Sequence, residues 1–479
     1  MIQIADIRFL TPMFIIAAAA IITLMIGVFF KKSQATIIFI CVVSLILSIY
    51  AYSKIFEEGV NIINNTLRFN ITSNAFGILI LLAIFITLLA SKNYLENTGI
   101  YFIEFYSLLL FACLGMLLMV HGNDLIIIFL GLEMMSICFY ILTGFMRKKI
   151  QSNESALKYF LLGSFLTGFL LIGISLIYGS TGGITNIINV FSNTQFFKSP
   201  VFIIGIALFL IGFMFKIGIF PFHMWIPDVY EGAPTIVSGM MSTAGKIAAV
   251  GTIAQIVFSS ENLKDFYVLF AILAVITMLF GNVIALAQSN LKRLLAYSSI
   301  SSAGYILVAF AAMNSSSTTA VLIYLFAYLF MQLGAFIVVS IIEVENFSKE
   351  SSPKTDIENY KGYAKKNPFL AFSLTIFLFS LAGIPPLAGF WGKYYLFYSA
   401  IISNKMFLVI IAIIAILLSI LSVFYYLRII VNMWFKEPDE PGEIQKKDYS
   451  AYFAVFLSLA GTIVFGFIPQ LIFTIFKIK

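Results

Sequence analysis

Charged residues are scarce in this chain. Asp, Glu, Lys and Arg make up 11% of its 479 residues, whereas a soluble domain carries about 25%. Together with a 61% share of hydrophobic residues, this scarcity excludes a soluble globular protein and indicates a polytopic membrane protein. The net charge of +7 is therefore no sign of nucleic-acid binding, and no nucleic-acid partner is expected.

Cysteine and histidine are also rare. Cys41, Cys113 and Cys138 lie in apolar runs without metal-ligand spacing, so we expect free, packed thiols. The two histidines, His121 and His223, are too few for a haem or multi-histidine metal site. Neither an iron–sulphur cysteine spacing nor a glycine-rich phosphate loop is present. We therefore expect no cofactor, no metal and no electron transfer within this chain.

Long apolar runs are abundant, and they predict an all-α membrane protein with about fourteen transmembrane helices. The N-terminal run continues past its small residues, so we expect it to remain as the first span. The predicted spans are 12–30, 36–56, 74–91, 100–120, 122–144, 155–179, 200–219, 234–259, 266–287, 294–313, 318–342, 369–398, 406–435 and 450–476.

The distribution of lysine and arginine predicts the orientation of these spans. With fourteen spans, both termini lie on one side of the membrane. One set of loops holds sixteen Lys and Arg residues, and the set that includes the termini holds eight. Because cytoplasmic loops are enriched in Lys and Arg, we expect both termini outside and loop 343–368 in the cytoplasm.

Two predicted spans are interrupted by a Gly-Ile-x-Pro sequence. The seventh contains Gly218-Ile219-Phe220-Pro221, and the twelfth contains Gly383-Ile384-Pro385-Pro386. Proline breaks a helix, and a membrane tolerates the break only where protein or a water-lined cavity satisfies the freed backbone groups. Trp225 and Trp391 follow the two breaks.

The breaks lie five spans apart. A tandem unit of five spans must be inverted, because five is odd, and inverted repeats are common in transporters. The predicted organisation is an N-terminal three-helix segment (1–99), a first five-helix repeat (100–259, spans 4–8), a second, inverted five-helix repeat (260–435, spans 9–13) and a C-terminal helix (436–479).

Five ionisable residues lie inside predicted spans: Glu133, Lys158, Lys216, Lys246 and Lys393. Each charge at the bilayer centre costs about 2.5–3.5 kcal/mol, so such residues are kept where they pair, reach water or carry ions. Lysine can release its proton when desolvated, whereas arginine does not, so a row of buried lysines can form a proton relay.

Three of the candidate residues have an open alternative. Glu133 can either act in proton transfer or form a structural ion pair. Lys158, one turn into its span, can either reach the membrane interface or pair with Glu133 on the preceding span. His223, just past the first break, can either bridge Lys216 and Lys246 or be a packing histidine.

Several motifs resemble the signature of the subunit N family of respiratory complex I, the proton-pumping NADH–quinone oxidoreductase. The resemblance covers essentially the whole chain. The matching runs are Phe220–Thr235 (FPFHMWIPDVYEGAPT), Ser242–Lys246 (STAGK), Leu291–Ile300 (LKRLLAYSSI), Leu381–Lys393 (LAGIPPLAGFWGK), Gly131–Glu133 (GLE) and Ala156–Tyr159 (ALKY). Gly245 stands where the family commonly has a proline.

The resemblance implies a proton-translocating membrane-arm subunit with fourteen spans. It implies a Glu–Lys pair of Glu133 and Lys158, and a proton path continuing through Lys216, Lys246 and Lys393. The implied partners are the other antiporter-like and small membrane-arm subunits and membrane lipids, with quinone bound elsewhere in the complex. FMN and iron–sulphur clusters are expected in partner subunits, and the expected location is the bacterial plasma membrane.

Two other functions stay open. The wider family includes the M and L subunits and subunits of multisubunit cation/proton antiporters. The Asp228–Pro234 run (DVYEGAP), and an ending after span fourteen without a long lateral helix, favour subunit N. The third possibility is a membrane scaffold with vestigial charges. Co-purification with flavin and iron–sulphur subunits separates the first two functions, and charge substitutions that abolish pumping but not assembly exclude the scaffold.

Overall fold

The computed structural model describes residues 4–30, 34–56, 59–99, 104–345, 355–437 and 448–476. In the first half of the chain, the elements are α1 (Ile4–Phe29), α2 (Gln34–Lys54), β1 (Val60–Ile62), β2 (Leu67–Phe69), α3 (Ile71–Asn97), α4 (Glu104–His121), α5 (Leu125–Thr143), α6 (Ile150–Ser180), α7 (Ile187–Ser192), η1 (Phe196–Lys198), α8 (Pro200–Ile217), α9 (Trp225–Gly232), α10 (Thr235–Met240), the π-helical turn η2 (Met241–Gly245) and α11 (Lys246–Phe258). The remaining elements are η3 (Glu261–Phe266), α12 (Tyr267–Leu286), α13 (Leu291–Ala312), α14 (Ser317–Glu345), η4 (Ile357–Tyr360), α15 (Tyr363–Lys366), α16 (Pro368–Ala382), α17 (Ala388–Ile401), α18 (Met406–Phe435), α19 (Tyr449–Phe467) and α20 (Gln470–Phe476).

The described residues contain thirteen helices that are long and apolar enough to cross a membrane, and each corresponds to a predicted span. The twelfth predicted span, 369–398, consists of two shorter helices, α16 and α17, which are separated at the second break. Counting this pair as one crossing gives the fourteen spans that the sequence predicts. The interruption predicted for this span is confirmed, because the chain turns at Gly383 and resumes helix only at Ala388.

Two segments that the sequence analysis assigned to loops are helical. Glu343 and Glu345 belong to the last turn of α14, and Lys292 and Arg293 lie in the first turn of α13. Part of the remaining loop forms η4 and α15. Residues 346–354, in the predicted cytoplasmic loop, lie outside the described residues.

The two breaks have the same backbone geometry. α8 ends at Gly218 (φ +86°) and α16 ends at Gly383 (φ +89°), both in the left-handed region that favours glycine. The amides of Gly218 and Ile219 both donate to the carbonyl of Met214, and those of Gly383 and Ile384 both donate to that of Phe379. Equivalent geometry at positions five spans apart agrees with the inverted repeat.

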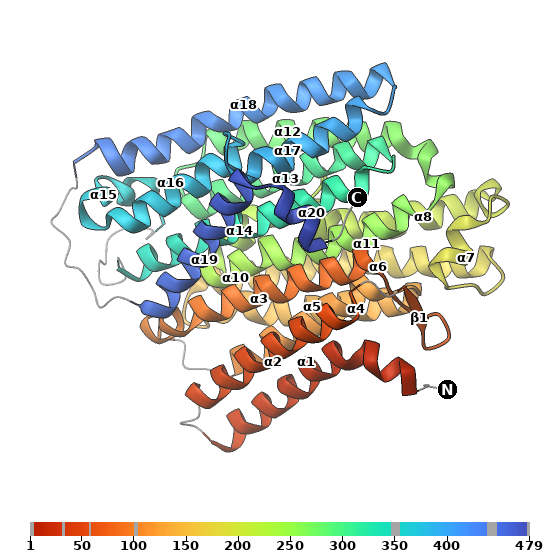
Figure 1. Cartoon of the computed structure of the whole chain (residues 1–479), viewed down its shortest axis with the longest axis horizontal. Coiled ribbons are helices and arrows are strands. Elements are labelled where there is room, and N and C mark those ends of the chain that lie inside the picture. Colours follow the sequence, from red (N-terminus) through yellow and green to blue (C-terminus); the bar gives the residue numbers. More distant parts are fainter. Residues whose placement is uncertain are drawn as a thin grey trace.

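The core of the protein is formed by three helices. α13, α14 and the continuous α10–η2–α11 segment are almost entirely buried, whereas in α1, α2, α6 and α18 only about a third of the residues are buried. Figure 1 shows α1 and α2 at one edge of the bundle and α18 at the opposite edge. Lys246, on the buried α10–η2–α11 segment, is therefore enclosed by other helices.

Candidate functional site

Lys216 lies in the last turn of α8, directly before the first break, and is 7% exposed. Its ammonium group is 3.5 Å from the hydroxyl of Tyr140 and lies over the rings of Tyr140, Tyr159 and Phe215, 5.3 Å from each centroid. Aromatic faces stabilise a cation without neutralising it. The site therefore holds a buried ammonium group without a direct carboxylate contact among the described residues.

Glu133, on α5, is half-buried and close enough to Lys216 for their charges to interact. Its Oε1 atom is buried and has no hydrogen-bond partner among the described residues. A buried, unpaired carboxylate oxygen is costly, which is typical of a group kept for a role other than stability. Glu133 is therefore a carboxylate whose charge acts on Lys216 without a direct contact among the described residues.

Lys158 has different partners from the expected one. It forms ion pairs with Glu154 (2.8 Å) and with Asp228 (3.0 Å), and its side chain is 44% exposed. The expected ion pair with Glu133 is not formed in the part of the chain that the structure describes. The reason is that α9 packs against α6 and brings Asp228 next to Lys158.

Asp228 also belongs to a second ion pair that the sequence analysis missed. One guanidinium nitrogen of Arg293 lies 2.7 Å from Asp228 and 2.9 Å from Glu231. Lys292, which directly precedes Arg293, is buried and donates to the carbonyl of Ala233 at 2.6 Å. These contacts join α9, the helix after the first break, to α6 and α13. The Asp228–Pro234 run (DVYEGAP) contains both acidic residues, but their basic partner Arg293 lies more than sixty residues away in the sequence.

Lys246 follows the π-helical turn η2 in the middle of a buried helix and is 2% exposed. Such turns occur frequently at functional sites. The Lys246 ammonium group donates to both the carbonyl and the hydroxyl of Ser299 on α13, the latter at 2.6 Å. A Cβ atom at Gly245 would lie 2.8 Å from the ring of Phe139, so close packing of α5 favours glycine before the lysine.

Lys393 lies on α17, after the second break, and is 4% exposed. Its ammonium group donates to the carbonyl of Ala382, the last residue of α16, at 2.9 Å, and to the hydroxyl of Ser419 at 2.8 Å. It also lies 4.8 Å from the centre of the Tyr305 ring. A pocket of about 420 Å³ between α17 and α18 reaches this lysine.

A row of buried polar side chains lies between Lys246 and Lys393. Ser298, next to the Lys246 partner Ser299, is hydrogen-bonded to Tyr426 at 2.5 Å. Tyr425 donates to Asn282 at 3.1 Å, and Asn282 donates to the hydroxyl of Tyr305 at 3.1 Å. Tyr305 in turn lies beneath the Lys393 ammonium group. Hydroxyl and amide groups can exchange protons with bound water, so this row can join the two lysines.

His223 is buried between Phe220 and Phe280, with ring centroids 5.5 and 6.2 Å away. Its Nδ1 atom has no hydrogen-bond partner among the described residues. Nor does the described part of the chain contain a hydrogen bond from His223 to Lys216 or Lys246. A bridging role therefore requires water, and it stays a prediction.

The described residues contain no group of three or more His, Cys, Asp or Glu side chains that could hold a metal ion. The three cysteines are free and buried, as expected. The chemistry that the arrangement supports is the holding and passing of protons by lysine, carboxylate and hydroxyl groups.

Comparison with known proteins identifies the family. Residues 122–419 match the family described as "NADH:quinone oxidoreductase/Mrp antiporter, TM". The chain is 39% identical to NADH-quinone oxidoreductase subunit N of Trichlorobacter lovleyi, over 98% of this chain and 96% of that protein. It is 36% identical to F(420)H(2) dehydrogenase subunit N of Methanosarcina mazei, over 97% and 96%.

Solved structures agree with this result. A chain of respiratory complex I from Thermus thermophilus has a TM-score of 0.81 and 29% identity, with coverage of 97% of this chain and 98% of that one. A chain of the Mrp complex from Dietzia sp. shares the fold, with a TM-score of 0.82, 19% identity and coverage of 96% and 95%. The chain thus belongs to the antiporter-like membrane-subunit family of NADH:quinone oxidoreductases and Mrp antiporters, among the N subunits of NADH-quinone oxidoreductase.

Proposed function

We propose that this chain is a proton-translocating subunit of the membrane arm of NADH–quinone oxidoreductase. Protons pass through a relay of Glu133, Lys158, Lys216, Lys246 and Lys393, and quinone reduction in partner subunits drives the transfer. The partners are the other antiporter-like and small membrane-arm subunits, and partner subunits carry FMN and iron–sulphur clusters.

One observation carries this proposal: three lysines are buried at the two helix breaks and at the π-helical turn, each in contact with hydroxyl groups or aromatic rings rather than with a carboxylate. Lys246 and Lys393 donate to serine hydroxyls and to backbone carbonyls. A buried ammonium group without a counter-ion readily gives up its proton, and a neighbouring carboxylate such as Glu133 favours the charged form. Alternation between these states is what a relay requires.

The proposal includes the placement of the chain in the membrane. The protein crosses the bacterial plasma membrane many times, both termini lie outside, and the segment between α14 and α16 faces the cytoplasm. The proposed units are 1–99, 100–259, 260–435 and 436–479, which place one broken helix in each repeat.

Substitution of the central lysine tests this function in the intact complex. We expect Lys246→Met to assemble, since methionine fills the same space, but to lower proton translocation per quinone reduced at least about tenfold, because a positioned proton-transfer group contributes roughly 100-fold or more. Lys264→Met is the matched control, because Lys264 is 47% exposed at the link between α11 and α12. Normal translocation by the Lys246 variant would exclude the relay.

The rival function is a cation/proton antiporter subunit. Mass spectrometry of the intact detergent-solubilised assembly separates the two. Subunits with flavin and iron–sulphur clusters support the oxidoreductase, and a complex that contains only antiporter-like subunits supports the antiporter.

A further inference from the structure

Glu343 is a buried carboxylate that the proposed relay does not use. It lies near the end of α14 and is 6% exposed. Its Oε2 atom accepts hydrogen bonds from the hydroxyl of Tyr94 on α3, at 3.0 Å, and from the hydroxyl of Thr235 on α10. Its Oε1 atom lies 3.9 Å from the ammonium group of Lys149. Four segments of the chain therefore meet at one carboxylate.

A stripe of hydroxyl groups connects Glu343 to the helix that carries Lys246. Thr235, Ser238 and Ser242 precede Lys246 at intervals of three or four residues, which keeps them on one side of the segment although Ser242 lies in the π-helical turn η2. The hydroxyls of Ser238 and Ser242 donate to the carbonyls of Tyr230 and Gly239. The three hydroxyl-bearing residues are fully buried, and Lys246 is 2% exposed. The hydroxyl of Thr235 is itself bonded to Glu343.

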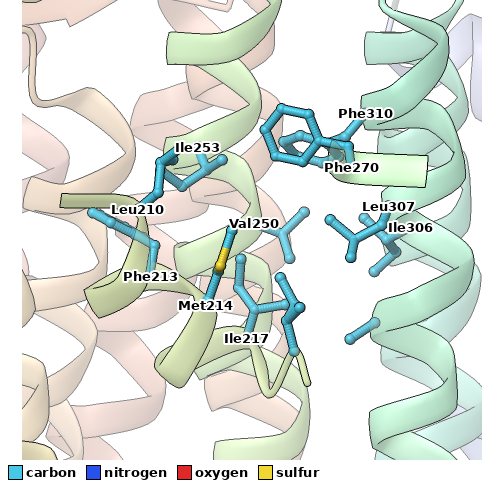
Figure 2. A pocket seen from close by; sticks show the side chains of 12 residues that line it. Leu210, Phe213, Met214, Ile217, Val250, Ile253, Phe270, Ile306, Leu307 and Phe310 are labelled. Carbon is cyan, nitrogen blue, oxygen red and sulfur yellow. The ribbon is translucent and has the colours of Figure 1, made fainter. Parts of the chain in front are cut away.

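Beyond Lys246 the same face becomes apolar. Val250 and Ile253 follow at the same spacing and line a cavity of about 20 Å³, together with Phe270 and Phe310 (Figure 2). All of its twelve lining side chains are apolar. A cavity of this size admits a water molecule only where two to four polar partners are present, so this one stays dry. On this face, polar groups therefore lead from Lys246 toward Glu343 but not toward the Phe258 end of the helix.

A pocket is lined by Val344 and Glu345, the two residues that follow Glu343 on α14. The pocket has a volume of about 580 Å³, lies between α3, α14 and α19, and is lined by Tyr94, Ser340 and the carboxylate-bearing residues Glu96, Glu345 and Asp448. Since one water molecule needs about 10–15 Å³, the pocket has room for many. Tyr94 lines this pocket, and its hydroxyl donates to Glu343 and accepts from the amide of Thr235, so this residue connects the pocket to the buried carboxylate.

We propose that Glu343 is the first buried proton acceptor on the route to Lys246, loaded from the pocket through the hydroxyl of Tyr94. The inference rests on the proposed proton-translocating function. Tyr94 gives its proton to Glu343 and takes one from water in the pocket. The protonated carboxyl then donates to Thr235, which passes a proton toward the hydroxyl stripe. Besides Tyr94 and Lys149, the titratable groups that act on Glu343 are Lys292 and Tyr360.

The test uses Glu343→Gln in the assembled complex, with quinone reduction and proton translocation measured between about pH 6 and pH 9. Loss of the carrier makes proton uptake limiting, so activity falls about tenfold or more at the alkaline end and less at the acid end. Tyr94→Phe, which keeps the ring, produces the same pH-dependent loss, and Glu343→Asp restores most of the activity. Glu261→Gln, at an 84% exposed carboxylate near the other end of the bundle, is the matched control.

Two outcomes overturn the inference while the proposed function stands. One is normal activity of Glu343→Gln at every pH in a preparation where Lys246→Met does not pump. The other is an equal loss at every pH that Tyr94→Phe does not reproduce, which identifies Glu343 as a group that only holds the start of α10. If Lys246→Met also pumps normally, the relay itself is wrong.

Discussion

Lys246 donates to both the carbonyl and the hydroxyl of Ser299, a residue of the neighbouring helix α13. A lysine with two neutral oxygen acceptors is held in place without a counter-charge, so its orientation is fixed in the charged state while its proton is not trapped by a carboxylate. Ser299 is followed in the same stretch by Ser301 and Ser302, which gives α13 an unusually polar face toward α14 and α18. In the proposed relay, this contact makes Ser299 the first group to receive a proton from Lys246.

Removal of the Ser299 hydroxyl is expected to weaken the relay without breaking the fold. In Ser299→Ala, Lys246 keeps the backbone carbonyl and loses one hydrogen bond worth about 1 kcal/mol, which corresponds to about a fivefold slower transfer. The measurement is the rate of proton translocation in reconstituted vesicles. Ser458→Ala, at a buried serine on α19, is the control and should translocate at the normal rate.

Glu133→Gln should give an assembled complex that pumps poorly. The side chain keeps its shape but loses the negative charge that acts on Lys216. Because quinone reduction and pumping are coupled in the proposed function, quinone reduction should fall as well. The measurements are the rate of quinone reduction and the protons translocated per quinone reduced. A normal rate together with a normal ratio would leave Glu133 with a structural role only.

Lys393→Arg distinguishes a need for positive charge from a need for reversible protonation. Arginine keeps the charge but holds its proton at any physiological pH. The complex should assemble, yet it should translocate protons little better than Lys393→Met. Proton uptake per electron pair in vesicles is the measurement. Pumping at the normal level with arginine would show that Lys393 does not act by releasing its proton.

The proposed orientation can be checked with two single cysteines. Glu358→Cys replaces a 65% exposed side chain between α14 and α16, and Glu261→Cys replaces an 84% exposed one between α11 and α12. In intact cells, an impermeant thiol reagent should label position 261 and not position 358. The native cysteines add little background, because all three are buried. The reverse labelling pattern would invert the orientation.

The sequence predicted the number of spans, the two breaks and the five ionisable residues within spans, because hydropathy, proline and charge are local signals. It did not predict what those residues touch. Lys158 was expected to pair with Glu133 but contacts Asp228, which lies seventy residues away in the sequence. Glu343 and Lys292 were assigned to loops because hydropathy falls before the helix ends. The burial of Glu343 and Lys292 depends on how α3, α10 and α13 pack together, and this packing cannot be predicted from a local sequence pattern.

The positions of Lys216 and Lys393 relative to their breaks have a consequence for energy transduction. Lys216 precedes its break and Lys393 follows its own. In the proposed inverted repeat, the two broken helices cross the membrane in opposite directions, so both residues stand on the same side of their breaks. The Lys393 ammonium group reaches back to the carbonyl of Ala382, directly before its break, and Lys216 lies directly before its own break. In the proposed relay, both lysines therefore act at the breaks, and a proton that moves between them travels along the membrane rather than across it. The electrical work against the membrane potential, roughly 2.3 kcal/mol per charge and per 100 mV, is then done in the two steps that cross the membrane, proton uptake and proton release.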